Sequence, residues 1–136
     1  MASTAPRIGV LERSDDHITL PVAAATTIYA GTLVAINASG YAVPASASAS
    51  LTVIGLAHET VTNAGSAGAR SIEVRLSNGR RSFKLKNSSS SVGIDDIGKT
   101  CYVVDNDTVS MTSTDTCAAG TVTGVESGIV WVRFVL

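Results

Sequence analysis

Short runs of strand-forming residues, separated by clusters of Gly, Asn, Asp and Ser, recur from residue 17 to the end of the chain. The last run, residues 128–136, contains β-branched and aromatic residues, which fit the half-buried surface of a pleated strand. No segment longer than about ten residues keeps a helical period, and the best helical candidate is a single turn near residues 92–98. The pattern therefore predicts an all-β fold, a small single-domain β-barrel or β-sandwich of short antiparallel strands.

The first 16 residues differ from the rest of the chain. They contain Pro6, two arginines and a short apolar patch from Ile8 to Leu11. This composition predicts an extended N-terminal arm, of the kind that a partner often orders. Residues 17–136 are then expected to form one β-domain, since a chain of 136 residues has the usual size of a single domain with its own core.

Two hairpins stand out in the strand pattern. Apolar residues alternate with charged ones over residues 72–76 and again over 83–86, on either side of Asn78-Gly79. Asn-Gly favours a type I′ turn because both residues tolerate positive φ, so these two runs are predicted to pair. Residues 121–126 are likewise predicted to pair with residues 129–135 across Ser127-Gly128. The stretch 62–69 is predicted to be a loop.

A faint internal repeat is also present. Residues 33–43 resemble residues 101–111 as a strand, a turn and a second strand. Each is followed by a Ser/Ala/Thr loop and then by a similar tetrapeptide, Val-Ile-Gly-Leu from residue 53 and Val-Thr-Gly-Val from residue 122. Two similar β-modules around one core would explain this likeness, and so would the limited vocabulary of β-hairpins.

The charge of the chain restricts its partners. Its net charge is −1, and charged residues make up 15% of it, compared with roughly 25% in an average soluble domain. Nucleic acids and anionic membrane surfaces bind basic patches, so neither is an expected partner. No apolar run approaches the ~18 residues of a membrane-crossing helix. A weakly charged surface of this kind is suited to contact with another protein.

Motifs of catalysis and metal binding are absent from the sequence. The two histidines, His17 and His58, have no ligand partner at the spacing of zinc sites. The sequence contains neither a G-x-S-x-G elbow nor a glycine-rich phosphate loop. Residues 105–107 begin like a calcium loop, but Val109 stands where a ligand is needed. We therefore expect no enzymatic activity, no small-molecule substrate, no cofactor and no metal.

The N-terminal residues have no continuous apolar core behind a basic start, so no signal peptide is predicted and synthesis in a cytoplasm is expected. Cys101 and Cys117 are then expected to be free thiols, the first in a strand and the second in a loop. The sequence neither requires nor excludes a disulfide between them.

Alternation along the last strand places Val130, Val132, Phe134 and Leu136 on one face and Trp131 and Arg133 on the other. If the first set faces the core, Trp131 and Arg133 lie together outside, and both residue types are common in interface hot spots. The alternative is that Trp131 belongs to the core and Arg133 extends its charge at the rim. With the apolar patch of the arm, the candidate partner interface consists of Ile8, Val10, Leu11, Trp131 and Arg133.

The sequence resembles the capsid decoration, or cement, proteins of tailed phages and prophages. The likeness covers about residues 27–135 and rests on Gly-Thr-Leu-Val from residue 31, Gly40-Tyr41, Val-Ile-Gly-Leu-Ala from residue 53, Ile-Glu-Val-Arg-Leu from residue 72, and the segment 97–134. These are apolar and turn positions, which specify a fold better than a role. The chain departs from the common pattern at Cys101 and in the Ser/Ala loop 45–50.

The resemblance implies a virion structural protein on the outside of a phage head, where it binds the major capsid protein at subunit junctions and stabilises the capsid lattice. It also implies a homo-oligomer and an arm that engages the capsid, which corresponds by position to residues 1–16. The alternative function is a β-domain of a phage fibre or surface structure that binds a receptor or carbohydrate. One Trp and three Tyr offer few stacking platforms for sugars.

Overall fold

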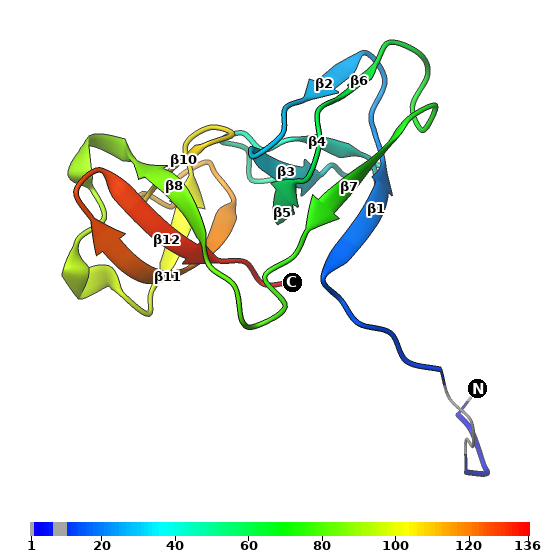
Figure 1. The fold of residues 1–136 in the computed structure, drawn as a ribbon, viewed down its shortest axis with the longest axis horizontal. Coiled ribbons are helices and arrows are strands. Elements are labelled where there is room, and N and C mark those ends of the chain that lie inside the picture. The colour runs from blue at the N-terminus through cyan, green and yellow to red at the C-terminus, as the bar shows by residue number, and fades with distance from the viewer. Residues whose placement is uncertain (1, 7–10) are drawn as a thin grey trace.

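The computed structural model describes residues 2–6 and 11–136 (Figure 1). This part of the chain contains no helix long and apolar enough to span a membrane. Its elements are twelve strands and two short 3₁₀ turns: β1 (His17–Pro21), β2 (Thr26–Ile28), β3 (Leu33–Ile36), β4 (Ala42–Pro44), β5 (Thr52–Ala57), β6 (Val61–Asn63), β7 (Ser71–Arg75), β8 (Phe83–Asn87), η1 (Ser88–Ser90), η2 (Ile94–Asp96), β9 (Thr100–Val103), β10 (Thr108–Ser110), β11 (Ala118–Glu126) and β12 (Ile129–Arg133).

The strands form two five-stranded units that lie side by side (Figure 1). The first, which we call the N-terminal sheet, has the order β1-β7-β5-β3-β4. The second, the C-terminal barrel, is closed in the order β10-β8-β12-β11-β9. Strands β2 and β6 form a separate two-stranded ribbon. The predicted all-β fold is confirmed, and the strand pairs are antiparallel apart from β8 with β10.

The two units share one topology. Strands β1, β7, β5, β3 and β4 of the sheet correspond in order to β8, β12, β11, β9 and β10 of the barrel. The barrel is closed by a parallel pair that includes Val109 and Asn87. In the sheet a single parallel bridge between Val22 and Ala42 joins the edges at the equivalent place. The N-terminal sheet is therefore a less completely closed version of the barrel.

The same pattern of backbone hydrogen bonds occurs in both units. The N–H of Gly31 donates to the carbonyl of Ala57 at 2.9 Å, and the N–H of Gly98 donates to the carbonyl of Val122 at 2.8 Å. In return, the N–H of Ala57 donates to the carbonyl of Thr32 at 2.9 Å, and the N–H of Val122 donates to the carbonyl of Lys99 at 2.9 Å. Thr32 and Lys99 directly follow the two glycines. The likeness in the sequence thus corresponds to two similar β-modules. The structural register pairs Leu33 with Thr100, one position from the sequence alignment. It also pairs Ala57 with Val122, so the tetrapeptide match of residue 53 with residue 122 is displaced by four positions.

The two units share part of their core. One cluster of buried apolar residues fills the barrel and takes in Leu33, Ala35, Val53 and Leu56 from the N-terminal sheet. A second cluster, which includes Ile28, Ile72 and Val74, belongs to the N-terminal sheet and its ribbon. Removal of these side chains from water is the main force that holds the units together.

The predicted hairpin around Asn78-Gly79 is wrong. Both residues have the expected positive φ, 50° and 68°. However, β7 pairs with β1 and β5, whereas β8 pairs with β12 and β10. Residues 76–82 therefore connect the two units. The turn chemistry is local and was correctly identified, but Phe83 and Leu85 are buried in the barrel core and determine the partners of β8.

Other local predictions have mixed outcomes. The hairpin of β11 with β12 is confirmed, with Glu126 opposite Ile129. The predicted single helical turn is present as η2. The predicted loop 62–69 is wrong at its start, because Thr62 and Asn63 belong to β6 and pair with β2. This strand is three residues long and lacks the alternating pattern of a longer strand, so the sequence contains little signal for it.

Candidate partner interface

The five predicted interface residues do not form one site in the described structure. Ile8 and Val10 lie outside the described residues. Leu11 lies on the arm with 94% of its surface exposed. Trp131 and Arg133 lie together on β12, half-buried and exposed respectively. The candidate interface therefore has two separate parts, the arm and the outer face of the barrel.

The alternation predicted for the last strand is confirmed over β12. Val130, Val132 and Phe134 are buried, with exposed fractions of 0%, 0% and 3%. Leu136 departs from this inner set because it is 47% exposed and lies beyond the end of the strand. Trp131 is on the outer face, so the alternative that placed it in the core is wrong. Its position follows from the pleat, which turns successive side chains to opposite faces.

Trp131 lies across the outer face of three strands. Its neighbours in the two adjoining strands are Lys84 of β8 and Gly124 of β11. An ideal Cβ on Gly124 would lie 3.2 Å from Cδ1 of Trp131, so the indole rests on the bare backbone of this glycine. The indole Nε1 donates a hydrogen bond to Oε1 of Glu126 at 3.3 Å, which gives the polar edge of the ring a partner.

A β-bulge positions this glycine. Opposite β12, the register of β11 shifts between Val122 and Gly124, so that Thr123 is an extra residue. The Oγ1 atom of Thr123 lies 2.7 Å from Oγ of Ser82 and 3.2 Å from the carbonyl oxygen of Trp131. Bulges change the direction of the side chains that follow them. Here the bulge brings Gly124 rather than a larger side chain beneath the indole.

Positive charges flank Trp131 on this face. Lys84 and Arg133 are both exposed, and neither forms an ion pair with any residue that the structure describes. By contrast, Lys86 pairs with Asp107, and Arg81 lies 3.7 Å from Asp16. We define the Trp131 face as Trp131, Lys84, Arg133 and Gly124. It thus combines an indole ring packed on Gly124 with two side-chain cations that have no ion-pair partner among the described residues.

The arm is attached to the body at Asp16. The backbone carbonyl of Asp16 accepts hydrogen bonds from the N–H of Leu76 at 3.0 Å and from Nη2 of Arg81 at 2.9 Å. Its carboxylate accepts a third from Nδ2 of Asn78 at 3.2 Å. All three donors belong to residues 76–82, which connect the two units. Residues 11–16 are exposed and lead away from the body (Figure 1).

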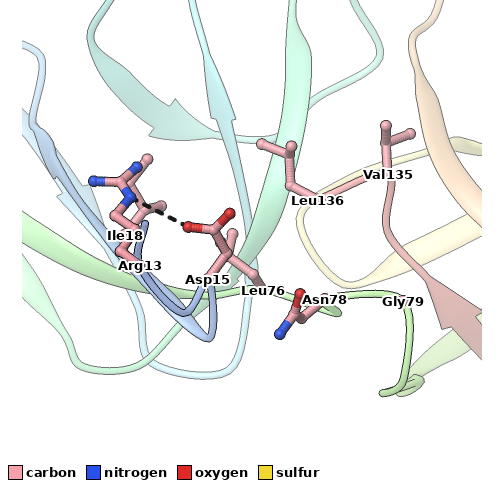
Figure 2. Close-up of a pocket in the computed structure, with 8 residues that line it drawn as sticks. All are labelled: Arg13, Asp15, Ile18, Leu76, Asn78, Gly79, Val135 and Leu136. Atoms are coloured by element: carbon pink, nitrogen blue, oxygen red, sulfur yellow. Dashed lines mark ion pairs between the residues drawn. The ribbon is translucent and has the colours of Figure 1, made fainter. Parts of the chain in front are cut away.

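A groove of about 290 Å³ lies at the base of the arm. Figure 2 shows Arg13 and Asp15 of the arm on one side of it and the C-terminal residues Val135 and Leu136 on the other. Arg13 Nε and Asp15 Oδ1 form an ion pair at 3.3 Å. Val135 is 86% exposed, so the groove has an open apolar wall. The sequence patterns indicated neither this groove nor Lys84 and Gly124, because long-range strand pairing creates both.

The described residues contain no group of three or more His, Cys, Asp or Glu side chains that could hold a metal ion. Cys101 and Cys117 are free and buried. Burial raises the pKa of the Cys101 thiol to about 11 and also raises the pKa of Cys117. Both are therefore protonated near neutral pH and are poor nucleophiles. The arrangement of the Trp131 face and the arm is suited to binding.

These observations define an all-β protein of two similar five-stranded units, with a supported aromatic face on one unit and an exposed arm on the other. No protein-family model, no curated protein and no solved structure matches the chain.

Proposed function

We propose that this protein is a non-enzymatic structural protein of a phage virion, which binds the outside of the head and stabilises the capsid lattice. The observation that carries the proposal is the Trp131 face. Tryptophan and arginine are enriched among the residues that dominate protein interfaces, and here they lie two positions apart on the same face of one strand. Lys84 and Arg133 have no ion-pair partners within the described part of the chain, so an acidic partner surface would complement them.

The arm supplies a second contact. It is attached at Asp16, and Leu11 exposes 94% of its surface to solvent. A capsid surface that covers Leu11 would remove this apolar side chain from water. Once one of the two contacts has formed, the other becomes an intramolecular event with a high effective concentration. Two contacts of modest affinity therefore give a high overall affinity. Two such contacts on neighbouring subunits of the major capsid protein would hold those subunits together.

The proposed partner is the major capsid protein, and the proposed location is the exterior of the virion after synthesis in the host cytoplasm. We also propose that the protein is a homo-oligomer on the head, because a symmetric lattice presents the same site many times and favours symmetric binders. The resemblance of residues 27–135 to capsid decoration proteins supports the same function.

The test is co-sedimentation of purified full-length protein with DNA-filled heads that lack it, from a lysate of a bacterial host whose induced prophage has the gene for this protein deleted. We expect saturable binding at a fixed ratio to the major capsid protein. Trp131→Ala and deletion of residues 1–16 should each weaken binding by roughly 30-fold, because a hot-spot residue contributes about 2 kcal/mol or more. Tyr29→Ala is the matched control, since Tyr29 is an aromatic residue with 60% exposure outside the Trp131 face.

Absence of binding to heads would contradict the proposal. One observation favours the alternative of a carbohydrate or receptor binder, because the indole supported by Gly124 presents a ring face on which a sugar could stack. Among the described residues, however, the aromatic ring pairs are His17 with His58 and Phe83 with Phe134, so no second ring extends this platform. Binding to a glycan array that Trp131→Ala abolishes, without binding to heads, would support the alternative.

A further inference from the structure

The two histidines of the chain meet across a strand of the N-terminal sheet. His17 is the first residue of β1, and His58 directly follows β5. Strand β7 lies between β1 and β5 in the sheet. His17 is opposite Arg75 of β7, and the N–H of His58 donates to the carbonyl of Glu73 in the same strand at 2.9 Å. Two residues that are distant in the sequence thus lie on the two sides of one strand.

The distance between the two rings fits a shared metal ion. Their centroids are 5.4 Å apart, the ring planes make an angle of 78°, and both side chains are exposed. When two imidazoles bind one tetrahedral Zn²⁺ through nitrogens at about 2.0–2.1 Å, their centroids lie roughly 5 Å apart. The observed separation is close to that value, so the two rings can bind one ion when side-chain rotation turns a nitrogen of each toward it.

We propose that His17 and His58 form a two-histidine binding site for a divalent cation that prefers imidazole ligands, with Zn²⁺ as the representative ion. Neutral imidazole is a good ligand for zinc, copper and nickel. No third His, Cys, Asp or Glu in residues 2–6 and 11–136 joins the pair, so the remaining coordination positions are open to water. The site is independent of the Trp131 face and of the proposed function.

The charged residues around the two histidines are compatible with a bound cation. The guanidinium carbon of Arg75 lies 5.2 Å from the centroid of the Phe83 ring, so the arginine is engaged with the C-terminal barrel. The carboxylate-bearing residues Glu73 and Glu59 are close to His58, one as its hydrogen-bond partner in β7 and the other as the next residue in the chain. Their negative charge favours a bound cation at longer range.

A bound ion would connect the edge of the sheet to its interior. Strand β1 is an edge strand, and it continues directly from the arm. A metal held by His17 and His58 would link β1 to the end of β5 over the intervening β7. Because the pair exists only in the folded chain, the ion stabilises the native state by mass action.

The experiment is a ZnCl₂ titration of the untagged full-length protein at pH 7.5, followed by NMR of the histidine rings. The chain contains two histidines, so two sets of imidazole signals report the whole site. We expect both sets to shift together, with saturation at one ion per chain and a rise in Tm that EDTA reverses. His17→Ala and His58→Ala should each weaken binding at least ~10-fold, since even loss of an outer partner of a metal-bound histidine costs about 10–100-fold.

Asp115→Asn is the matched control, because it removes an exposed carboxylate from the loop before β11 and leaves both rings and their acidic neighbours in place; its affinity should stay within about threefold of that of the parent. The proposal is wrong if equimolar Zn²⁺ leaves the imidazole signals of the parent unchanged. It is also wrong if the two signals saturate independently, or if His17→Ala binds as tightly as the parent. The titration of the parent decides the question even where a variant folds poorly.

Discussion

Gly55 of β5 packs directly against the backbone carbonyl of Arg75 in β7, so closely that a Cβ at this position would collide with the carbonyl oxygen. Gly120 of β11 stands in the same relation to the carbonyl of Arg133 in β12. Each glycine thus allows two strands to approach at the point where the second strand leaves the sheet. The repetition of this contact shows that the two units share their packing as well as their topology.

Gly55→Ala and Gly120→Ala should each destabilise the protein, because the obstructing atoms belong to the backbone and cannot rotate away. Overpacking of this kind costs ~1–3 kcal/mol or more. Urea unfolding followed by Trp131 fluorescence measures the loss. Gly65→Ala is the control, since its nearest neighbours lie at ordinary contact distances of 3.4 and 3.6 Å. Equal stability of Gly120→Ala and Gly65→Ala would contradict the prediction.

Asn63, at the end of β6, is 1% exposed and connects three backbone segments. Its Nδ2 lies 3.1 Å from the carbonyl oxygens of Val22 and Ala23 and 2.9 Å from that of Ser66, so one of its two hydrogens is shared between two acceptors. Its Oδ1 accepts from the N–H of Gly65 at 3.1 Å. The amide therefore holds the ribbon of β2 and β6 against the end of β1.

Asn63→Ala removes the hydrogen-bond partner of the Ala23 carbonyl and of the Gly65 N–H, whereas the carbonyls of Val22 and Ser66 keep bonds from Gly68 and Ala69. We expect a loss of about 2–3 kcal/mol in the free energy of unfolding, since a buried polar group left unpaired costs roughly 1–3 kcal/mol. Chemical denaturation gives the value, with the exposed neighbour Thr62→Ala as the control. A loss no greater than that of Thr62→Ala would show that water replaces the amide without cost.

The ion pair of Lys86 with Asp107 joins β8 to the turn before β10, with Nζ and Oδ2 2.8 Å apart. Hydrogen bonds from Lys86 and Thr108 lower the pKa of Asp107 to about 2. The carboxylate therefore favours the folded state above its ordinary pKa of 3.8, and this contribution is lost as the pH falls toward 2. The lysine has a raised pKa, so its contribution is present below 10.5 and lost at higher pH.

Asp107→Asn should reduce stability slightly at pH 6, because the pair is largely exposed to solvent. The difference in Tm from the parent should shrink between pH 4 and pH 2. Thermal unfolding by circular dichroism across this range provides the comparison, and Asp115→Asn, at another exposed aspartate, is the control. A difference that stays constant down to pH 2 would mean that the carboxylate is not responsible.

Cys101 is fully buried, and its Sγ lies 3.6 Å from the carbonyl oxygen of Gly120. Because burial raises its pKa to about 11, the thiolate is scarce at pH 8. In a Cys117→Ser variant, Cys101 should react with a disulfide reagent at least ~100-fold more slowly in the native protein than in urea. Equal rates in the two conditions would show that the barrel opens readily.

Much of the architecture could be predicted from local patterns. The alternation of Val130, Trp131 and Val132 correctly separated the two faces of the last strand, although it left open whether Trp131 belonged to the core. The pairing of β11 with β12 followed from a short turn between two strand-forming runs. The repeat was visible in outline, although its register was displaced by one residue in the first part and by four residues in the tetrapeptide match. The bulge in β5, where pairing with β3 shifts, shows why one-residue offsets escape a sequence comparison.

Part of the candidate interface could be predicted from the sequence. Trp131 and Arg133 share a face because side chains two residues apart in a strand point the same way. Lys84 and Gly124 escaped prediction, since they come from two other strands and reach Trp131 by cross-strand pairing. His17 and His58 escaped for the same reason, because motif spacing detects ligands that are close in sequence and this pair is formed across β7.

The sequence by itself determined most of the strands, the alternation of the two faces along them and the turns, since each depends on residues within a few positions of one another. Tertiary structure decided the partners of β7 and β8, although the Asn78-Gly79 turn between them has the φ values of a hairpin. The physical reason is that a turn constrains a few dihedral angles, whereas strand partners are chosen by the collective burial of apolar faces. Phe83 and Leu85 are buried within the barrel, and that burial outweighs the local preference.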